Sequence, residues 1–136
     1  MEKQIEKLIE QCPYKVHIVV QDYKTYSPVF QLREHDVFSS ASIIKVPILI
    51  AILAHLQNTN GHLQQVVEIT EENVVDFSVL TEQKQTSATL YELLVWMIIT
   101  SDNTATNACI DFLGMDTLNK YFNEIGLKST RIQRKM

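Results

Sequence analysis

Two short groups of residues in this sequence have the types and spacing for nucleophilic chemistry. The first is Ser42-Ile43-Ile44-Lys45, a serine followed three positions later by a lysine. Residues i and i+3 of a helix share a face, so a helix here brings the lysine within reach of the Ser42 hydroxyl. A serine hydroxyl is a weak nucleophile until a base takes its proton. Burial among apolar residues lowers the pKa of a lysine, so that Lys45 can act as that base.

The second group is Ser101-Asp102-Asn103, which begins 59 positions after Ser42. Apolar residues recur at helical spacing over residues 89–100, and Ser101 continues the same inward face. A plainer reading is a turn at a helix end, with Asp102 or Asn103 capping the helix that follows. The first group alone is roughly an even-odds accident in a chain of this length, whereas the second tripeptide arises by chance only about once in tens of such proteins. Their conjunction at this separation is much rarer and favours a shared site.

The helix that should carry Ser42 is predicted over residues 42–56. Its apolar residues occupy every side, which is typical of a helix buried all round. Ser39 and Ser40 are candidate N-caps, and Pro47 is tolerable because it lies in the first turns. The buried helix N-terminus would place partial positive charge where an oxyanion develops on the substrate of Ser42.

Other elements follow from periodicity and from helix-breaking residues. Residues 62–88 read as polar and irregular, with a short helical start at Thr70, and Glu71, Glu72 and Asp76 read as a solvated acidic stretch. The remaining predictions are a helix at 3–11, strands at 14–21 and 25–32 with an edge or bulge at Pro28, helices at 89–100 and 104–113, the latter stopped by Gly114, and a helix capped by Asp116 that ends at Gly126.

Composition excludes several classes of function. The 136 residues carry a net charge of -4 without clustered cations, which argues against nucleic acid as a partner. The two cysteines and four histidines lack metal-ligand spacing, so no metal or other cofactor is expected. The N-terminus lacks the apolar stretch of a signal peptide, and the longest apolar run, nine residues from Val46, is too short for a membrane span. The localisation stays open.

These motifs resemble those of a known superfamily. The segments ASIIKVP (41–47) and ITSDNTATN (99–107) look like the first two motifs of class A β-lactamases and penicillin-binding proteins. Residues 116–126 and 129–134 are also similar to that family, so the resemblance runs from about residue 14 to 136. It implies an α+β fold with an antiparallel sheet flanked by helices and an all-helical subdomain. Members of the family are usually secreted or periplasmic.

The resemblance also implies a role for each motif residue. Ser42 would attack the β-lactam carbonyl and become acylated, with Lys45 as base or proton relay. Ser101 would pass a proton to the leaving nitrogen, and Asn103 would bind the amide of the substrate side chain. Asp102 would hold the loop rather than touch substrate.

Two parts of the family pattern are missing from this sequence. The third motif, Lys-Thr/Ser-Gly, does not occur, because none of the glycines at 61, 114 and 126 follows such a pair. The glutamate that activates the deacylating water in class A enzymes should lie on a loop that would begin near Met136. We therefore expect residues 1–136 to be the N-terminal half of one catalytic domain, with the first helix and hairpin at 1–32 and the helical subdomain at 42–126. A complementary C-terminal fragment is then an expected partner.

The sequence thus predicts a serine hydrolase that forms an acyl-enzyme with β-lactams and hydrolyses them, once a C-terminal portion completes it. A D-Ala-D-Ala peptidase acting on a peptidoglycan-like substrate is the runner-up. A serine-type glutaminase shares S-x-x-K but fits the flanks of the second motif less well. A catalytically incomplete relative that binds or regulates remains open because the third motif is missing.

Overall fold

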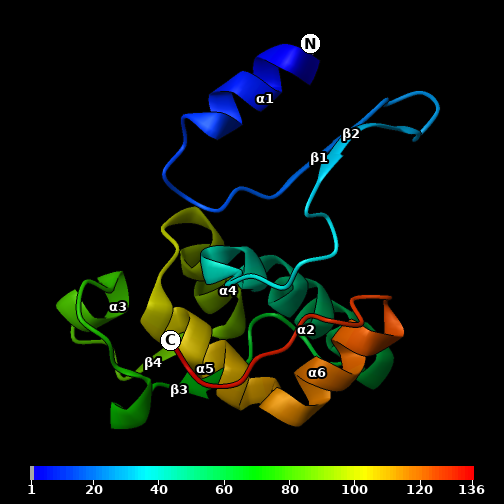
Figure 1. Ribbon diagram of the computed structural model, residues 1–136. Helices are drawn as coiled ribbons and strands as arrows, with labels where there is room; N and C mark the ends of the chain where they lie inside the picture. The colour runs from blue at the N-terminus through cyan, green and yellow to red at the C-terminus, as the bar shows by residue number, and fades with distance from the viewer. Residues whose placement is uncertain (1) are drawn as a thin grey trace. The chain divides into compact units, whose positions relative to one another are not determined.

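The computed structural model describes residues 2–136, which form two compact units that divide between Ser39 and Ser40 (Figure 1). The first unit holds helix α1 (Glu2–Glu10) and a hairpin of strands β1 (Ile18–Gln21) and β2 (Pro28–Leu32). The antiparallel register shifts between Val20 and Gln21, where Gln21 pairs with Pro28. The predicted helix, hairpin and irregularity at Pro28 are therefore confirmed, although both strands are shorter than expected.

The second unit is mainly helical. Its four longer helices enclose the core, and two three-residue strands form a separate antiparallel ladder in which Val66 pairs with Thr89. The elements are η1 (Ala41–Ile44), α2 (Lys45–Thr59), β3 (Val66–Glu68), η2 (Glu71–Asn73), α3 (Val79–Glu82), β4 (Ser87–Thr89), α4 (Leu90–Ile99), α5 (Asn103–Leu113) and α6 (Met115–Glu124).

The stretch 62–88 is more ordered than its composition suggested. The short helical start at Thr70 is confirmed as η2, where Thr70 and Asn73 form a reciprocal capping box. The strands β3 and β4 and the one-turn helix α3 are corrections to the prediction of irregular chain. Elements of three or four residues are too short for hydrophobic periodicity to reveal.

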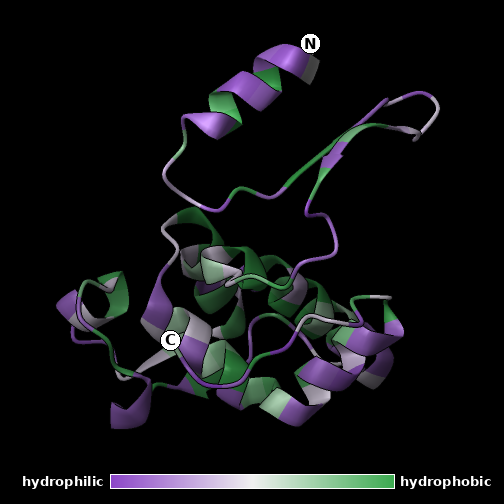
Figure 2. Ribbon diagram, viewed as in Figure 1, coloured by the Kyte–Doolittle hydropathy of each residue, from purple (hydrophilic) through white to green (hydrophobic). Residues whose placement is uncertain are grey.

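The core of the second unit lies among α2, α4, α5 and α6. Fully buried side chains come from each of these helices, including Ile48, Leu93, Ile110 and Phe122. In Figure 2, α6 alternates between hydrophilic and hydrophobic colouring, whereas α4 is hydrophobic through most of its length. Helix α5 ends at Leu113, directly before Gly114, whose φ of 83° suits glycine, as the sequence predicted.

The prediction that the Ser42 helix is buried on all sides is wrong for the described part of the chain. Ile48, Ala51 and Ile52 are buried, but Ile43 and Val46 are 66% and 51% exposed. The pattern of apolar residues identified surfaces suited to burial, and nothing within the second unit, residues 40–136, covers this one.

The start of this helix also differs from expectation. Ser40 takes the capping position with helical backbone angles and no side-chain cap, because a side-chain cap needs an extended residue. By length and composition alone, the 19 residues Ala41–Thr59 are long and apolar enough to cross a membrane, a test that the core helix of a folded protein also passes. Five buried residues of this stretch belong to the core cluster, namely Ile44, Ile48, Ala51, Ile52 and Leu56.

Two further predictions at helix ends need correction. Asp116 lies in the first turn of α6, but Gly114 occupies the capping position and no side chain caps the helix. Ile98 continues the apolar periodicity of residues 89–100, and Ile125 continues that of the helix ending at Gly126, which predicts burial for both. They are nevertheless 42% and 43% exposed, because Ile98 lies in the last turn of α4 and Ile125 directly follows α6.

Leu93 tests the assignment of the core. It is fully buried, so Leu93→Ala should lower the free energy of unfolding by about 2–5 kcal/mol, through lost burial and the cavity left behind. Leu127→Ala is the matched control, because Leu127 is 38% exposed and its loss should cost much less. Urea unfolding followed by circular dichroism measures both values, and equal losses would contradict the core described here.

Candidate active site

Ser42 lies on the exposed turn η1, immediately before α2. The residue before it, Ala41, has a φ of 43°. This left-handed backbone conformation is energetically unfavourable for any residue that has a Cβ atom. Strained backbone of this kind persists only where the surrounding structure holds it, and it is frequent at functional sites. The serine is therefore presented by a strained turn at the helix start, not by the regular helix that the sequence predicted.

Ser101 is the second strained residue of the site. Helix α4 ends at Ile99, and Ser101 follows with a φ of 58°. Its hydroxyl donates a hydrogen bond to the Ser42 Oγ at 2.8 Å. The structure thus brings the two serines together, as predicted. The prediction assumed that Ser101 continues the inward face of α4, whereas its side chain is oriented by a left-handed turn after the helix.

Lys45 is buried beneath the two serines, with 2% of its surface exposed. Its Nζ donates to the Ser101 carbonyl oxygen at 2.5 Å, to the Ser101 Oγ at 2.9 Å and to the Asn103 Oδ1 at 2.7 Å. Among residues 2–136, no direct hydrogen bond joins Lys45 to Ser42, so the Ser101 hydroxyl bridges them. Ser42, Ser101, Lys45 and Asn103 therefore form one hydrogen-bonded cluster.

Burial sets the protonation of this lysine. Desolvation lowers the pKa of Lys45 below the ordinary lysine value, and the nearby negative charge of Asp102 opposes this only in part. A buried amine with a lowered pKa releases its proton more readily than a surface lysine. The cluster consequently combines two serine hydroxyls with an amine whose pKa is lowered.

Asp102 holds the frame around this cluster. Its Oδ1 accepts from the Ala105 N–H at 2.9 Å, which caps α5. Its carboxylate also accepts from the Ser78 Oγ at 2.9 Å and from the Val79 N–H at 2.8 Å. One buried side chain therefore fixes the start of α5, where Asn103 lies, and the start of α3.

Sequence reasoning did not identify Ser78 as part of this frame. Ser78 is 1% exposed and accepts a hydrogen bond from the Thr81 N–H at the start of α3. A capping residue type before the apolar pair Val79-Leu80 was the available signal. The signal was not recognised because α3, with only four residues, is too short to show helical periodicity.

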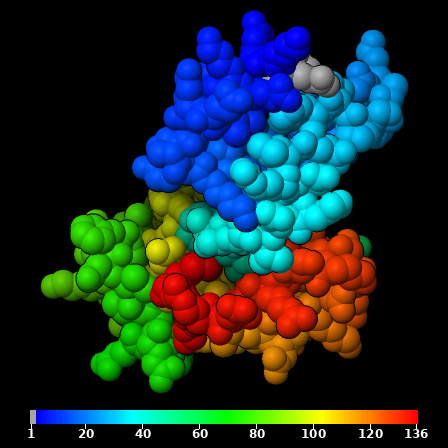
Figure 3. Space-filling model, in the orientation of Figure 1, coloured from blue at the N-terminus to red at the C-terminus, as the bar shows by residue number. Residues whose placement is uncertain are grey.

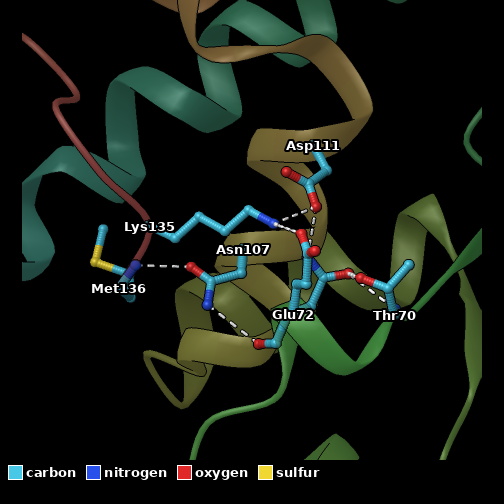
Figure 4. A network of polar contacts seen from close by, with 7 residues as sticks. Thr70, Glu72, Asn107, Asp111, Lys135 and Met136 are labelled. Carbon is cyan, nitrogen blue, oxygen red and sulfur yellow. Dashed lines mark hydrogen bonds and ion pairs between the residues drawn. The ribbon is translucent and has the colours of Figure 1, made fainter.

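A second polar network lies further along α5 and was also missed (Figure 4). Asn107 is one helical turn beyond Asn103; its Oδ1 accepts from the Met136 N–H at 2.8 Å, and its Nδ2 donates to the Asn73 carbonyl oxygen at 3.1 Å. Asp111, another turn on, accepts from Lys135 Nζ and Asn73 Nδ2, each at 2.6 Å. These bonds fasten the C-terminal residues against α5 and η2.

The C-terminal residues also lie against the η2 segment at the molecular surface. In Figure 3 the C-terminal residues, in red, lie beside the green segment that includes η2. The Nζ atom of Lys135 also lies 3.9 Å from the Oε2 atom of Glu72, an exposed residue of that segment. The acidic stretch, with Glu71, Glu72 and Asp76 all exposed, is solvated as the sequence predicted.

Neither cysteines nor histidines assemble into a further site. Burial raises the pKa of Cys109 to about 12, which keeps its thiol protonated and unreactive. Cys12 and Cys109 are both free. Among residues 2–136, no group of three or more histidine, cysteine, aspartate or glutamate side chains is placed to hold a metal ion.

Comparison with known families identifies the fold around this cluster. A model described as the β-lactamase enzyme family matches residues 1–136. The chain belongs to this family. It is 31% identical over 104 residues to a β-lactamase of Rhodobacter capsulatus, covering 75% of this chain and 36% of that protein. It is also 31% identical over 112 residues to β-lactamase FAR-1 of Nocardia farcinica, and this match covers 81% of this chain and 36% of that protein.

Solved structures agree with the family. An ancestral class A β-lactamase superposes with a TM-score of 0.87 at 27% identity, covering 98% of this chain and 52% of that one. A structure named PBP-A gives a TM-score of 0.88 at 27% identity, covering 99% and 52%. The predicted family and β-lactamase-like fold are confirmed. The chain spans about half the length of these structures, and less of the curated relatives.

Asp102→Ala should therefore destabilise the second unit. It removes a helix cap and leaves the buried Ser78 hydroxyl without its acceptor, which together should lower the free energy of unfolding by about 2–4 kcal/mol. Asp116→Ala is the control, because Asp116 is exposed and makes no cap; its effect should stay within about 1 kcal/mol. Urea denaturation compares the two, and a small effect at Asp102 would contradict its framing role.

Proposed function

We propose that this chain carries the acylation machinery of a serine β-lactamase-type hydrolase, in which Ser42 attacks the carbonyl carbon of a β-lactam. The observation that carries the proposal is the hydrogen-bonded cluster of Ser42, Ser101, Lys45 and Asn103. Membership of the β-lactamase family supports it. Because the chain spans only part of its relatives, we propose that turnover requires further polypeptide.

The cluster suits each proton transfer of acylation. For this step the two hydroxyls rotate, so that Ser42 donates to Ser101 and Ser101 donates to neutral Lys45, the reverse of the hydrogen bonds described above. As the Ser42 Oγ bonds to the carbonyl carbon, its proton passes to Ser101, and the proton of Ser101 passes to Lys45. The lactam C–N bond then breaks. Ser101 returns a proton to the leaving nitrogen and regains one from Lys45, so the cluster ends in its starting protonation state with Ser42 acylated.

The remaining residues have supporting roles in this proposal. The N–H groups in the first turn of a helix have no partner within the helix, and the Ser42 N–H is our candidate donor to the developing oxyanion. Asn103 accepts from Lys45 through its Oδ1, which leaves its amide N–H groups to bind a carbonyl of the substrate. The carboxylate of Asp102 is already hydrogen-bonded to Ser78, Val79 and Ala105, and we propose no contact between it and the substrate.

Ser42→Ala should abolish covalent labelling by a fluorescent penicillin. The test protein is this chain joined to the part of the ancestral class A β-lactamase that it does not span. Labelling should fall at least about 100-fold, because no other group in the cluster replaces the nucleophile. In-gel fluorescence and intact mass measure the adduct, and a chromogenic cephalosporin measures turnover.

Ser40→Ala is the matched control for this experiment. Ser40 lies two positions away on the same turn, and its Oγ makes only a long 3.5 Å contact with the Ala41 carbonyl oxygen. This variant should label like the parent protein. Equal labelling of the Ser42→Ala variant and the parent would refute the assignment of the nucleophile.

A D-Ala-D-Ala peptidase is the second candidate, and one observation favours it. Among residues 2–136, no carboxylate hydrogen-bonds to Ser42, Ser101 or Lys45, and Asp102 is engaged by Ser78, Val79 and Ala105. A group that activates water to release the acyl chain must then come from elsewhere. A persistent adduct without cephalosporin turnover would favour the peptidase, and rapid turnover the β-lactamase.

The acylation rate should rise with pH as Lys45 loses its proton. Burial lowers the pKa of this lysine, so the midpoint should lie below 10.5, its ordinary value. Lys45→Arg should remove this rise and most of the labelling, because a guanidinium stays protonated. Stopped-flow labelling from pH 5 to pH 10 provides the profile, and a rise unchanged by Lys45→Arg would exclude Lys45 as the base.

A further inference from the structure

The turn that joins β1 to β2 carries a pair of exposed tyrosines. Tyr23 is 87% exposed and Tyr26 is 71% exposed. Their ring centroids lie 6.4 Å apart, and the two ring planes are tilted by 46°. We call residues 22–27 the hairpin tip, which is the loop between the two strands in Figure 1. The whole tip belongs to the first unit.

Hydrogen bonds to Asp22 hold the tip in one conformation. Its Oδ1 accepts from the Lys24 N–H at 2.9 Å, and from the N–H and the hydroxyl of Thr25 at 2.8 Å and 3.0 Å. The Asp22 carbonyl oxygen accepts from the Tyr26 N–H at 2.8 Å. These bonds, with the one from the Thr25 N–H first, hold the pKa of Asp22 below its ordinary value, so the turn persists in mildly acidic solution. The tip is therefore pre-organised for binding.

Tyr26 has a backbone conformation that is unusual for its residue type. Its φ of 55° lies in the left-handed region, where glycine or asparagine is common and a bulky side chain is rare. The packing of the first unit does not need a ring here, because the side chain is exposed. Strained backbone of this kind is frequent at functional positions. What tyrosine adds at this position, compared with glycine, is an aromatic ring held out in solvent.

The side chains of the tip indicate the chemistry of a partner. Residues 23, 25, 26 and 27 all carry hydroxyl groups, Lys24 carries an ammonium group, and the tip contains no Leu, Ile, Val, Met, Phe or Trp. Segments that insert into lipid rely on Trp, Phe and Leu, and the core of a protein interface is more apolar than this turn. An aromatic face attracts the positive ends of C–H bonds. A sugar ring combines such C–H faces with a rim of hydroxyl groups, so it matches the tip.

We propose that the hairpin tip binds a glycan chain of β-linked pyranose sugars, with Tyr23 and Tyr26 stacked on neighbouring sugar rings. Pyranoses whose hydroxyl groups are equatorial expose flat C–H faces that suit an aromatic ring. The separation and tilt of the two tyrosines do not allow both to lie flat on one sugar, so a twisted chain fits them better than a single ring. Lys24 and Ser27 are placed to hydrogen-bond the hydroxyl groups at the rim.

Titration of the 136-residue chain with cellohexaose and with chitohexaose tests this assignment. Both oligosaccharides are uncharged and β-linked, and we expect at least one to bind in isothermal titration calorimetry. Tyr23→Ala should weaken that binding at least about tenfold, because a stacking ring is lost. Tyr26→Gly should weaken it at least about tenfold for the same reason. Since glycine suits a φ of 55°, Tyr26→Gly should not lower the melting temperature, and its loss of binding is then not a loss of fold.

Tyr14→Ala is the matched control. Tyr14 is an 80% exposed tyrosine of the same unit, but it precedes β1 and lies outside the tip. Its replacement should change the affinity less than about twofold. Tyr23→Phe should keep most of the binding, because the ring remains.

Several outcomes would overturn the proposal. They are the absence of binding to both oligosaccharides, equal weakening by Tyr14→Ala, and undiminished binding by Tyr26→Gly. Binding to phosphatidylcholine vesicles without binding to either glycan would instead assign the tip to a membrane surface. The titration contains no β-lactam and every variant lies in the first unit, so these outcomes do not depend on acyl transfer by Ser42.

Discussion

The buried carboxylate of Asp102 is the interaction on which the candidate site depends. It accepts hydrogen bonds from Ser78, Val79 and Ala105, and so joins the starts of α3 and α5. Its neighbours in sequence, Ser101 and Asn103, are thereby fixed on either side of it, where both accept from Lys45. A buried charge is costly unless it is fully hydrogen-bonded. This requirement is met here by the same bonds that set the geometry of the site.

Much of the site could be predicted from the sequence because its residues are close together within two short motifs. The spacing of Ser42 and Lys45, and the position of Ser101 after an apolar helix, pointed to residues that the structure joins in one hydrogen-bonded cluster. The backbone that orients them could not be predicted. Ala41 and Ser101 both have positive φ angles without being glycine, and such conformations are imposed by surrounding contacts rather than by local preference. Ser101 was thus placed in the site by an argument whose premise, a continuing helical face, does not hold.

The same distinction applies to the fold. Long apolar helices such as α4 and α5 were predictable because their periodicity extends over ten residues or more. The β3–β4 ladder and α3 depend on pairing and capping contacts between residues distant in sequence. The attachment of the C-terminal residues depends on Asn107 and Asp111, polar residues whose partners, Asn73, Lys135 and Met136, carry no pattern. Periodicity likewise marks α2 as apolar on every side without revealing which polypeptide covers each side.

The burial of Lys45 explains how this chain, which spans about half of the related structures, holds an ordered hydrogen-bonded cluster. Lys45 gains its low pKa from burial inside the second unit, beneath Ser101 and beside the Asp102 frame. That burial needs only α2, the Ser101–Asn103 segment and their neighbours, all present in this chain. The two serines differ from the lysine, because Ser42 and Ser101 are exposed whereas Lys45 is buried beneath them. The hydrogen bonds that order the cluster therefore lie within this chain, and under the proposed function the exposed serines are the part of the cluster that a substrate would meet.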